Sequence, residues 1–406
     1  MAQSLPVIIV GAGMAAYSLA REFRKLDKST PLLLVSSDRA GSYSKPMLSN
    51  ALAMGKAPDQ LLMQSAEQMS TTLDATIVAG VAVTIIDTAA RTIGCDDGRT
   101  IAYRDLVLAL GATPIRLALA GDGAGAVLSV NHLDDYAVLR ERLAALGRPA
   151  RVTILGAGLI GCEFADDLVA GGHQVTLVDP NPRPLAALAA PGLSDALVKA
   201  WATLPIALKL NTTAQAVTRG AAGLTVQLAD GSAVDTDIVL SAVGLRPSIA
   251  LAQSAGLSTA RGIVIDEYGA TSVAHVYALG DCAEYRTANG GAVMPYIAPL
   301  LTAARAIGAT LAGTPTPIVL RNDAVVVKTA SLKLALAPPP AGSTGDWRHA
   351  EDGERIVARF VDADGIVRGF GLTVHTPALR TALMAELGTP HPDSGEGPSV
   401  APASPL

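Results

Sequence analysis

The chain has few aromatic residues and no excess of positive charge. Phe, Trp and Tyr make up 3% of its 406 residues, which argues against the stacked aromatic platforms that bind single-stranded nucleic acid. A formal net charge of −5 provides no general basic surface for DNA, RNA or an anionic membrane. We therefore expect no nucleic acid among the partners of this protein.

Cysteines and long apolar runs are also scarce. Cys95, Cys162 and Cys282 are far apart and form neither a C-x-x-C pair nor a metal-ligand pattern. We expect three unpaired thiols in a reducing cytoplasm and no metal site. No uninterrupted apolar run reaches the roughly 18 residues that span a bilayer. The sequence therefore predicts a cytoplasmic protein without membrane insertion.

A strand–turn–helix–strand pattern occurs twice in the chain. Residues 5–39 contain a short apolar strand, a glycine turn, a helix pattern and a second apolar strand, and residues 150–184 repeat this plan. Apolar strands of this kind suit a parallel sheet that is covered on both faces. The duplication predicts an α/β fold with two Rossmann-like dinucleotide-binding domains.

Each unit carries a glycine fingerprint between its first strand and its helix. The residues are Gly11, Gly13 and Ala16 in the first unit and Gly156, Gly158 and Gly161 in the second. The first glycine permits a tight turn, the second lets a pyrophosphate approach the backbone, and the third small residue lets the helix pack on the strand. One fingerprint is a weak signal, because it also fits a mere tight turn. Two fingerprints, each inside a complete unit, predict two bound dinucleotides.

Polar residues end the second strand of each unit. A carboxylate at Asp179 would accept hydrogen bonds from ribose hydroxyls and repel a 2′-phosphate, which favours NADH over NADPH. The alternative is a solvated loop carboxylate, and Arg183, four residues further on, weakens the preference for NADH. In the first unit Ser36, Ser37 and Asp38 occupy the corresponding place. Because hydride chemistry needs a donor and an acceptor, FAD together with NADH is the economical pair.

Further motifs resemble those of the FAD-dependent pyridine nucleotide oxidoreductase superfamily. Residues 106–116 and 237–251 look like its paired glycine crossovers, and residues 271–285 are similar to its second FAD motif. By this resemblance Asp281 would hydrogen-bond the ribityl chain of FAD. The motifs occur in the order of the family and extend over about residues 5–310.

The resemblance implies a domain organisation. It has an FAD-binding domain made of residues 1–112 and 246–320, an NAD-binding domain of residues 113–245, a small α+β C-terminal domain of residues 321–386, and a tail of residues 387–406. The tail is rich in proline, glycine and serine, and we expect it to be disordered.

The stretch GSYSKPMLSN, residues 41–50, distinguishes among the branches of the superfamily. Disulfide-type relatives carry redox cysteines there, and this chain has none. Together with GAGLIGCEFADDL (156–168) and VVVKT (325–329), the stretch most closely resembles the rubredoxin–NAD reductases of the alkane-oxidation type. That likeness implies that electrons pass from NADH through FAD, one at a time, to rubredoxin, a small iron protein. A ferredoxin or flavorubredoxin reductase of the same fold and a flavin-bound NADH sensor are the alternatives.

The resemblance also implies roles for single residues. The backbone of Gly11, Ala12, Gly13, Met14 and Ala15 would cradle the pyrophosphate of FAD. Lys45 and Glu163 are the two candidate catalytic residues. Lys45 would offset negative charge on FAD, and Glu163 would lie at the reactive edge of the flavin. The alternatives are a surface lysine and a glutamate in the first turn of its helix, where the helix dipole stabilises it.

Three further candidates come from other parts of the chain. The strand at Val83 would place backbone groups against adenine, and Val293 would precede a helix that starts at Pro295 and faces the flavin. Lys328 would lie over the flavin, near a local Lys/Arg rim that attracts an acidic rubredoxin. A core valine and an exposed strand lysine are the alternatives for Val83 and Lys328.

Overall fold

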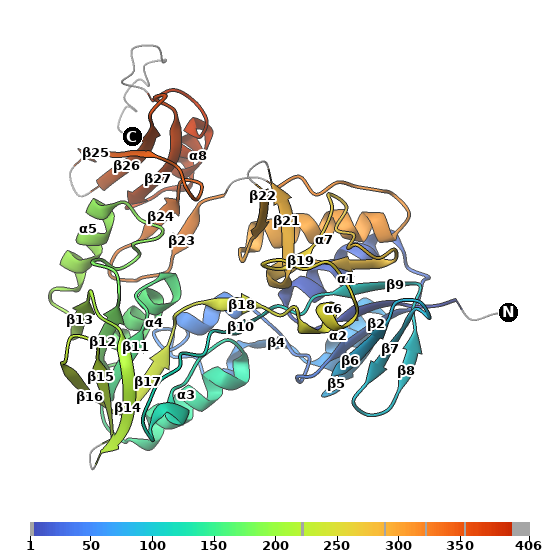
Figure 1. The fold of residues 1–406 in the computed structure, drawn as a ribbon, viewed down its shortest axis with the longest axis horizontal. Coiled ribbons are helices and arrows are strands. Elements are labelled where there is room, and N and C mark those ends of the chain that lie inside the picture. The colour runs from blue at the N-terminus through green and yellow to red at the C-terminus, as the bar shows by residue number, and fades with distance from the viewer. Residues whose placement is uncertain (1–3, 221–222, 288–289, 321–322, 353–354, 392–406) are drawn as a thin grey trace.

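The computed structural model describes residues 4–220, 223–287, 290–320, 323–352 and 355–391 (Figure 1). Its first unit is built on a five-stranded parallel sheet. The strands in spatial order are β20 (Val276–Ala278), β9 (Asp105–Leu108), β1 (Val7–Val10), β2 (Leu32–Ser36) and β5 (Thr76–Ala79). The sheet therefore joins the N-terminal part of the chain to a strand that lies beyond the second unit.

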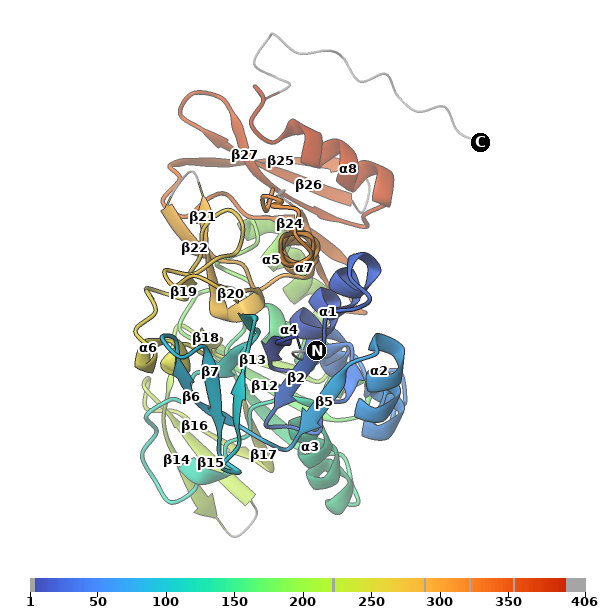
Figure 2. The same cartoon turned by 90° about the vertical axis from the view of Figure 1, so that its right-hand side faces the viewer.

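Helices cover this sheet because its central strands are buried along their whole length and are apolar except for Ser36 at the end of β2 and Asp105 at the start of β9. Every residue of β1, β2 and β9 is buried. Helix α1 (Met14–Leu26) follows β1 directly and packs against α7 (Ile297–Leu311), as Figure 2 shows. The helices approach closely at Gly308, where an added Cβ would lie 3.1 Å from the Phe23 nitrogen.

The second unit repeats this plan. Its parallel sheet contains β13 (Ile206–Leu210), β12 (Gln174–Asp179), β11 (Arg151–Leu155) and β17 (Ile238–Ser241). Helix α4 (Leu159–Ala170) follows β11, and α3 (Leu133–Ala145) and α5 (Pro191–Trp201) belong to the same unit. Two parallel units of this kind match the predicted α/β fold class.

Smaller sheets complete the two units. They are β6 (Val83–Asp87) with β7 (Thr92–Cys95) and β8 (Thr100–Ala102); β14 (Ala214–Gly220) with β15 (Gly223–Leu228) and β16 (Ala233–Thr236); β19 (Ile263–Val264) with β21 (Ala283–Thr287) and β22 (Gly290–Val293); and β3 (Ser42–Tyr43) with β4 (Leu62–Gln64). The two connections between the units run side by side, since β10 (Ala112–Pro114) pairs antiparallel with β18 (Leu245–Pro247).

The C-terminal part forms a third, smaller unit. Its antiparallel sheet contains β23 (Val325–Val327), β24 (Leu334–Ala337), β27 (Val367–Thr373), β26 (Arg355–Asp362) and β25 (Gly345–Asp352), with helix α8 (Pro377–Glu386) against it. The sheet shares a hydrophobic core with α5 of the second unit (Figure 1), where Leu193, Leu197 and Trp201 pack against Leu334 and Leu336. The C-terminal unit is therefore attached to the second unit by apolar packing.

The predicted start of the disordered tail, residue 387, is too early in the chain. Residues 387–391 follow α8 and pair with the turn before β27. The Gly388 nitrogen donates to the Val367 oxygen at 2.8 Å, the His391 nitrogen donates to the Gly365 oxygen at 2.9 Å, and His391 is buried. Composition indicated disorder here, but backbone pairing with a neighbouring turn orders these five residues. Residues 392–406 lie outside the described part of the chain.

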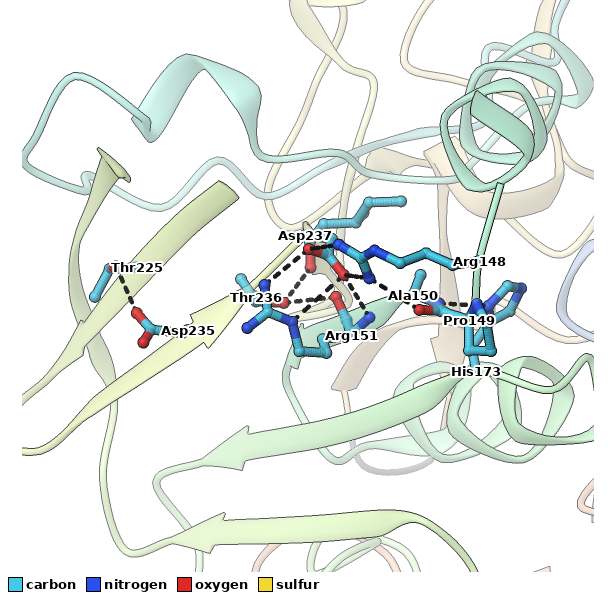
Figure 3. A network of polar contacts seen from close by, with 10 residues as sticks. Arg148, Pro149, Ala150, Arg151, His173, Thr225, Asp235, Thr236 and Asp237 are labelled. Carbon is cyan, nitrogen blue, oxygen red and sulfur yellow. Dashed lines mark hydrogen bonds and ion pairs between the residues drawn. The ribbon is translucent and has the colours of Figure 1, made fainter. Parts of the chain in front are cut away.

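A buried carboxylate holds the edge of the second sheet together. Asp237, between β16 and β17, accepts a bidentate pair of hydrogen bonds from Arg148, both at 2.9 Å (Figure 3). It also accepts hydrogen bonds from the backbone nitrogen of Arg151 at 2.8 Å and from its guanidinium at 2.9 Å. The bonds from Arg148, joined by those from Arg151, hold the pKa of Asp237 well below its usual range, although burial acts in the opposite direction.

We expect Asp237→Asn to lower the free energy of unfolding by about 2–3 kcal/mol at pH 7, because the variant loses charge-assisted hydrogen bonds. The native pKa is lowered, so the contribution of Asp237 is present above the ordinary aspartate pKa of about 4 and is lost below it. Urea unfolding at pH 7 and pH 3.5 should show a smaller difference from wild type at the lower pH. Asp195→Asn, in an exposed pair with Arg183, is the control and should cost less than about 1 kcal/mol.

Candidate functional site

One large cleft of about 2380 Å³ runs between the three units. Its lining includes the glycine turns of both parallel units and residues of the C-terminal sheet. The sequence-predicted residues that line it are Gly11, Ala12, Gly13, Met14, Ala15, Ser36, Ser37, Asp38, Lys45, Val83, Gly156, Gly158, Glu163, Asp179, Asp281, Val293 and Lys328. Gly161 does not line the cleft, because it packs against the Gly156 carbonyl, where an added Cβ would collide.

The first glycine of each turn is required by its backbone conformation and by a neighbouring carbonyl group. Gly11 has a φ of +114°, and its Cβ would collide with the Ala109 carbonyl oxygen. Gly156 has a φ of +103°, and its Cβ would lie 2.7 Å from the Ala242 carbonyl oxygen. Both positions combine a left-handed backbone with a close neighbour, so only glycine fits them.

The second glycine of each turn has no such requirement. Gly13 and Gly158 have ordinary φ values of −78° and −74° and are the N-caps of α1 and α4. Apart from the residue itself and its two chain neighbours, no described atom lies within 4 Å of a Cβ placed on Gly13 or Gly158, and neither helix has a side-chain N-cap. Open space in front of uncapped helix amides is what an approaching pyrophosphate needs. The two turns therefore fit two dinucleotides.

Asp179 lies at the carboxyl end of β12, beside the second turn. It is buried, so the solvated alternative is wrong. Oδ2 accepts a hydrogen bond from the Ala157 nitrogen at 2.6 Å, and Oδ1 accepts two from Asn181 at 2.8 Å. The exposed Arg183 pairs with Asp195 at 2.8 Å and does not line the cleft. Asp179, and not Arg183, therefore lines the cleft at the position where the sequence predicts a ribose-binding carboxylate.

The corresponding residues of the first unit form a small polar turn. The Ser36 hydroxyl donates to Asp38 Oδ1 at 2.8 Å, and the same oxygen accepts a hydrogen bond from the Ala40 nitrogen at 2.8 Å. Val83, at the start of β6, is half-buried and borders the same end of the cleft. This end is therefore polar on one side and apolar on the other, as an adenosine would need.

Glu163 forms a buried ion pair with Lys328. It lies in the second turn of α4, so the first-turn alternative is wrong. Oε2 lies 2.7 Å from Lys328 Nζ and accepts a hydrogen bond from the Ser49 hydroxyl at 2.6 Å, and Oε1 accepts one from the Lys328 nitrogen at 3.0 Å. Lys328 Nζ also donates to Ser49 at 3.1 Å and to the Pro46 carbonyl. All three ammonium protons thus have partners within the protein.

Two more carboxylates of α4 reach the neighbouring units. Asp166 accepts hydrogen bonds from the Ser331 nitrogen at 3.2 Å and hydroxyl at 2.7 Å. Asp167 accepts them from the nitrogens of Leu52 at 3.2 Å and Ala53 at 2.7 Å, and burial raises the pKa of Asp167 to about 6. These contacts were not predicted, although two adjacent acids in an apolar helix were a visible signal. Helix α4 therefore connects all three units.

Lys45 and Asp281 lie near each other in the lining of the cleft. Nζ of Lys45 lies 4.0 Å from Asp281 Oδ2. Burial lowers the pKa of Lys45, against the effect of Asp281 and Asp135, and burial raises the pKa of Asp281, against the effect of Lys45. Lys45 begins a 3₁₀ helix, η1 (Lys45–Ser49), where it is half-buried and lines the cleft. A half-buried cation with its nearest carboxylate oxygen 4.0 Å away suits a negatively charged ligand.

The start of α7 differs from its predicted position. The helix begins at Ile297 with Tyr296 as its N-cap, so Pro295 precedes it, and Val293 ends β22. Proline fits the extended backbone before a helix as well as its first turn, and residue type alone did not distinguish the two. Tyr296 and Ile297 are exposed at the cleft.

Family models cover nearly the whole chain. The model of the pyridine nucleotide-disulphide oxidoreductase family matches residues 5–305. This chain belongs to that family. A second model, the rubredoxin binding C-terminal domain, matches residues 317–387. The family resemblance seen in the sequence is confirmed, and so are the predicted fold class and the cofactors FAD and NADH.

Named relatives and solved structures agree with this family. The chain is 42% identical to the rubredoxin-NAD(+) reductase of Alcanivorax borkumensis, over 94% of this chain and 98% of the relative. It is 35% identical to the nitric oxide reductase FlRd-NAD(+) reductase of Aeromonas salmonicida, over 90% and 92%. A ferredoxin reductase of Rhodopseudomonas palustris superposes with a TM-score of 0.85 at 25% identity, over 95% and 96% of the two chains. The fold of the present chain is also that of putidaredoxin reductase in its covalent complex with putidaredoxin. The two superpose with a TM-score of 0.85 at 23% identity, over 95% of this chain and 93% of the other.

The cysteines do not contribute to the cleft. Cys95, Cys162 and Cys282 lie within the described residues, are buried and unpaired, and do not line the cleft. Burial raises the pKa of the Cys162 thiol above its usual range and that of Cys282 to about 11. Although the family name refers to a disulphide, these three thiols have neither the pairing nor the thiolate character that disulfide exchange needs. Among the described residues, no helix is long and apolar enough to cross a membrane.

Proposed function

We infer that the protein is an NADH-dependent rubredoxin reductase that passes electrons from NADH through FAD to rubredoxin. One observation carries this function. The two dinucleotide turns open into a single cleft, and part of the wall of that cleft comes from the sheet that matches the rubredoxin binding domain. Relatives named rubredoxin-NAD(+) reductase, at 41–42% identity over 94% of this chain, support it.

In this proposal FAD and NADH bind to different units of the protein. FAD belongs to residues 1–112 and 246–320, with its pyrophosphate at Gly13, and NADH belongs to residues 113–245, at Gly158 and Asp179. When bound, FAD supplies a group that accepts a hydride and can release electrons singly, which links a two-electron donor to a one-electron iron protein. Lys45, held beside Asp281, offsets negative charge in the middle of the cleft.

Glu163 and Lys328 position the C-terminal unit. Their ion pair ties α4 to the end of β23, and Ser49 and Pro46 tie the same lysine to the first unit. A partner protein bound to the C-terminal sheet is thereby kept at a fixed place relative to both dinucleotide sites. Two exposed apolar residues of the cleft lining, the N-cap Tyr296 and the first α7 residue Ile297, fit the small and transient contact of an electron-transfer complex. The Lys/Arg rim stays a prediction.

The test is the choice of electron acceptor. Purified yellow protein should oxidise NADH rapidly and anaerobically with rubredoxin, slowly with a plant-type ferredoxin, and much more slowly when NADPH replaces NADH. Rapid bleaching of the flavin by NADH without rubredoxin turnover would reject the partner and leave the cofactors standing. Slow reoxidation with every acceptor would instead favour an NADH sensor.

A second candidate acceptor is a flavorubredoxin. Relatives at 33–35% identity are named nitric oxide reductase FlRd-NAD(+) reductases and match over 90–95% of this chain. Preferred turnover with a flavorubredoxin over a free rubredoxin would establish that alternative. A place in an alkane-hydroxylation chain of the cytoplasm rests on the sequence resemblance alone, and loss of growth on alkanes after deletion of the gene would test it.

A further inference from the structure

Asn181 is an exposed residue of the second unit to which no motif assigns a role. It lies two positions after Asp179, in the bend that follows β12, and it lines the cleft. Its side-chain nitrogen Nδ2 and its backbone nitrogen both donate to Asp179 Oδ1 at 2.8 Å. The other carboxylate oxygen, Oδ2, accepts a hydrogen bond from the Ala157 nitrogen at 2.6 Å. Among the described residues, three donors therefore hold the buried carboxylate at the predicted ribose position.

The number of these donors limits what Asp179 can bind. A carboxylate accepts hydrogen bonds at about four lone-pair positions. Two donors on Oδ1 and one on Oδ2 leave one position for a ligand. The adenosine ribose of NADH carries two neighbouring hydroxyls, and each needs an acceptor when it leaves water. Asp179 can accept from both hydroxyls only if one of the protein donors withdraws.

One of the three donors can withdraw without any movement of the backbone. The other two are backbone N–H groups. Pro180 and Pro182 flank Asn181 and restrict its backbone, and its carbonyl accepts a hydrogen bond from the Asn211 nitrogen at 3.2 Å. Nδ2 belongs instead to an exposed side chain, and exposed side chains change rotamer within nanoseconds. The lone pair that Nδ2 occupies becomes accessible from the cleft when this side chain turns away.

We propose that the Asn181 amide holds the place of a ribose hydroxyl on Asp179 and is displaced when NADH binds. In the NADH-free protein the amide satisfies a buried carboxylate, which is unfavourable to leave without a donor. In the complex one hydroxyl takes over the hydrogen bond of the amide, and the other uses the remaining position on Oδ2. This inference rests on the proposed function, because it needs NADH in the second unit.

The proposal gives Asn181 an effect on NADH affinity opposite to that of a ligand contact. A hydroxyl that displaces an intramolecular hydrogen bond gains less than one that displaces water. The amide of Asn181 therefore weakens the binding of NADH, although it lies in the binding site. A side chain that merely oriented Asp179 for the ribose would strengthen binding, so the sign of the effect distinguishes the two roles.

The experiment removes the amide and keeps the backbone donor. Stopped-flow reduction of the FAD-loaded protein at increasing NADH concentration gives the dissociation constant and the limiting rate of flavin reduction separately. We expect Asn181→Ala to lower the dissociation constant about threefold to tenfold, the factor that corresponds to one intramolecular hydrogen bond. The limiting rate should stay within about twofold of wild type, because the reacting end of NADH is unchanged. An unchanged or higher dissociation constant would overturn the proposal.

A double-mutant cycle with the ligand identifies the displaced contact. Wild type and Asn181→Ala are compared with the 2′-deoxyadenosine and 3′-deoxyadenosine analogues of NADH. With the analogue that lacks the displacing hydroxyl, the dissociation constants of the two proteins should agree within about twofold, since no displacement is needed. With the other analogue the gain should persist. An equal gain with NADH and both analogues would also contradict the proposal.

Ser232→Ala is the matched control. The Ser232 hydroxyl and backbone nitrogen donate to Asp230 Oδ1 at 2.7 and 2.9 Å, so the same local pattern of donors occurs in an exposed turn of the same unit. Neither residue lines the cleft, and this variant should leave the dissociation constant of NADH unchanged. A wild-type protein whose bound FAD is not reduced by NADH would instead overturn the proposed function.

Discussion

Lys328→Met should lower the free energy of unfolding by about 3–5 kcal/mol, because it removes the cation from a carboxylate that stays buried. Glu163 is 1% exposed and lies 2.7 Å from the ammonium group. Methionine keeps most of the volume of lysine but provides no charge and no donor. Glu163 would then retain the Ser49 hydroxyl and the residue 328 backbone nitrogen as its partners, which do not replace a charge. Urea unfolding of the apoprotein at pH 7 measures the loss.

Two comparisons show whether burial causes this loss. Arg183→Met breaks a pair of similar length, 2.8 Å, between exposed side chains, and should cost less than about 1 kcal/mol. Adding Glu163→Gln to Lys328→Met removes the uncompensated charge and should restore part of the lost stability. If Lys328→Met costs no more than Arg183→Met, the ion pair is not what holds the C-terminal unit on α4.

The sequence predicted those parts of the fold that local spacing encodes. The two glycine turns had to lie between a strand and a helix, and the structure places Gly11 and Gly156 there with left-handed backbones. The pair Asp230–Gly231, a sequence typical of tight hairpin turns, joins β15 to β16. In each case the residues that determine the conformation are neighbours in the chain. Their chemistry is therefore visible without a tertiary structure.

The parts that were not predicted depend on residues far apart in the chain. Glu163 and Lys328 are separated by 165 positions, so no spacing rule connects them. The ordered segment at 387–391 also escaped prediction, since its composition is that of a disordered tail and its order comes from pairing with residues 365–367. Pairing partners of this kind become visible only in the folded chain.

Replacing Gly13 or Gly158 by alanine should have the other large effect, a loss of dinucleotide binding. Its physical reason is contact with the bound dinucleotide and not a contact within the protein. Glycine at a negative φ with no atom near its Cβ is unfavourable for the folded state, because the free chain loses more entropy on folding. The methyl group of an alanine at either position would meet no described atom within 4 Å beyond its own chain neighbours. The apoproteins Gly13→Ala and Gly158→Ala should therefore be as stable as wild type, or more stable by up to about 1 kcal/mol.

Dinucleotide binding, unlike stability, should be weakened in these variants. In the proposed sites the pyrophosphate lies against the backbone of these residues, where a methyl group would push it off the helix amides. We expect Gly13→Ala to weaken FAD binding about 100-fold, from overpacking and a lost charge-assisted hydrogen bond together. Gly158→Ala should retain FAD and weaken NADH binding by a similar factor. Flavin fluorescence measures the first loss, and anaerobic titration of the flavin protein with NADH measures the second.

The two variants test each other. If the first unit binds FAD and the second binds NADH, each alanine impairs one ligand and spares the other. A crossed result, with FAD lost from Gly158→Ala, would exchange the assignments of the two units. Gly11→Ala provides the contrast within one turn, because its Cβ would collide with the Ala109 carbonyl and the apoprotein itself should be destabilised. A Gly13→Ala protein that is destabilised like Gly11→Ala would mean that the second glycine serves the fold and not the cofactor.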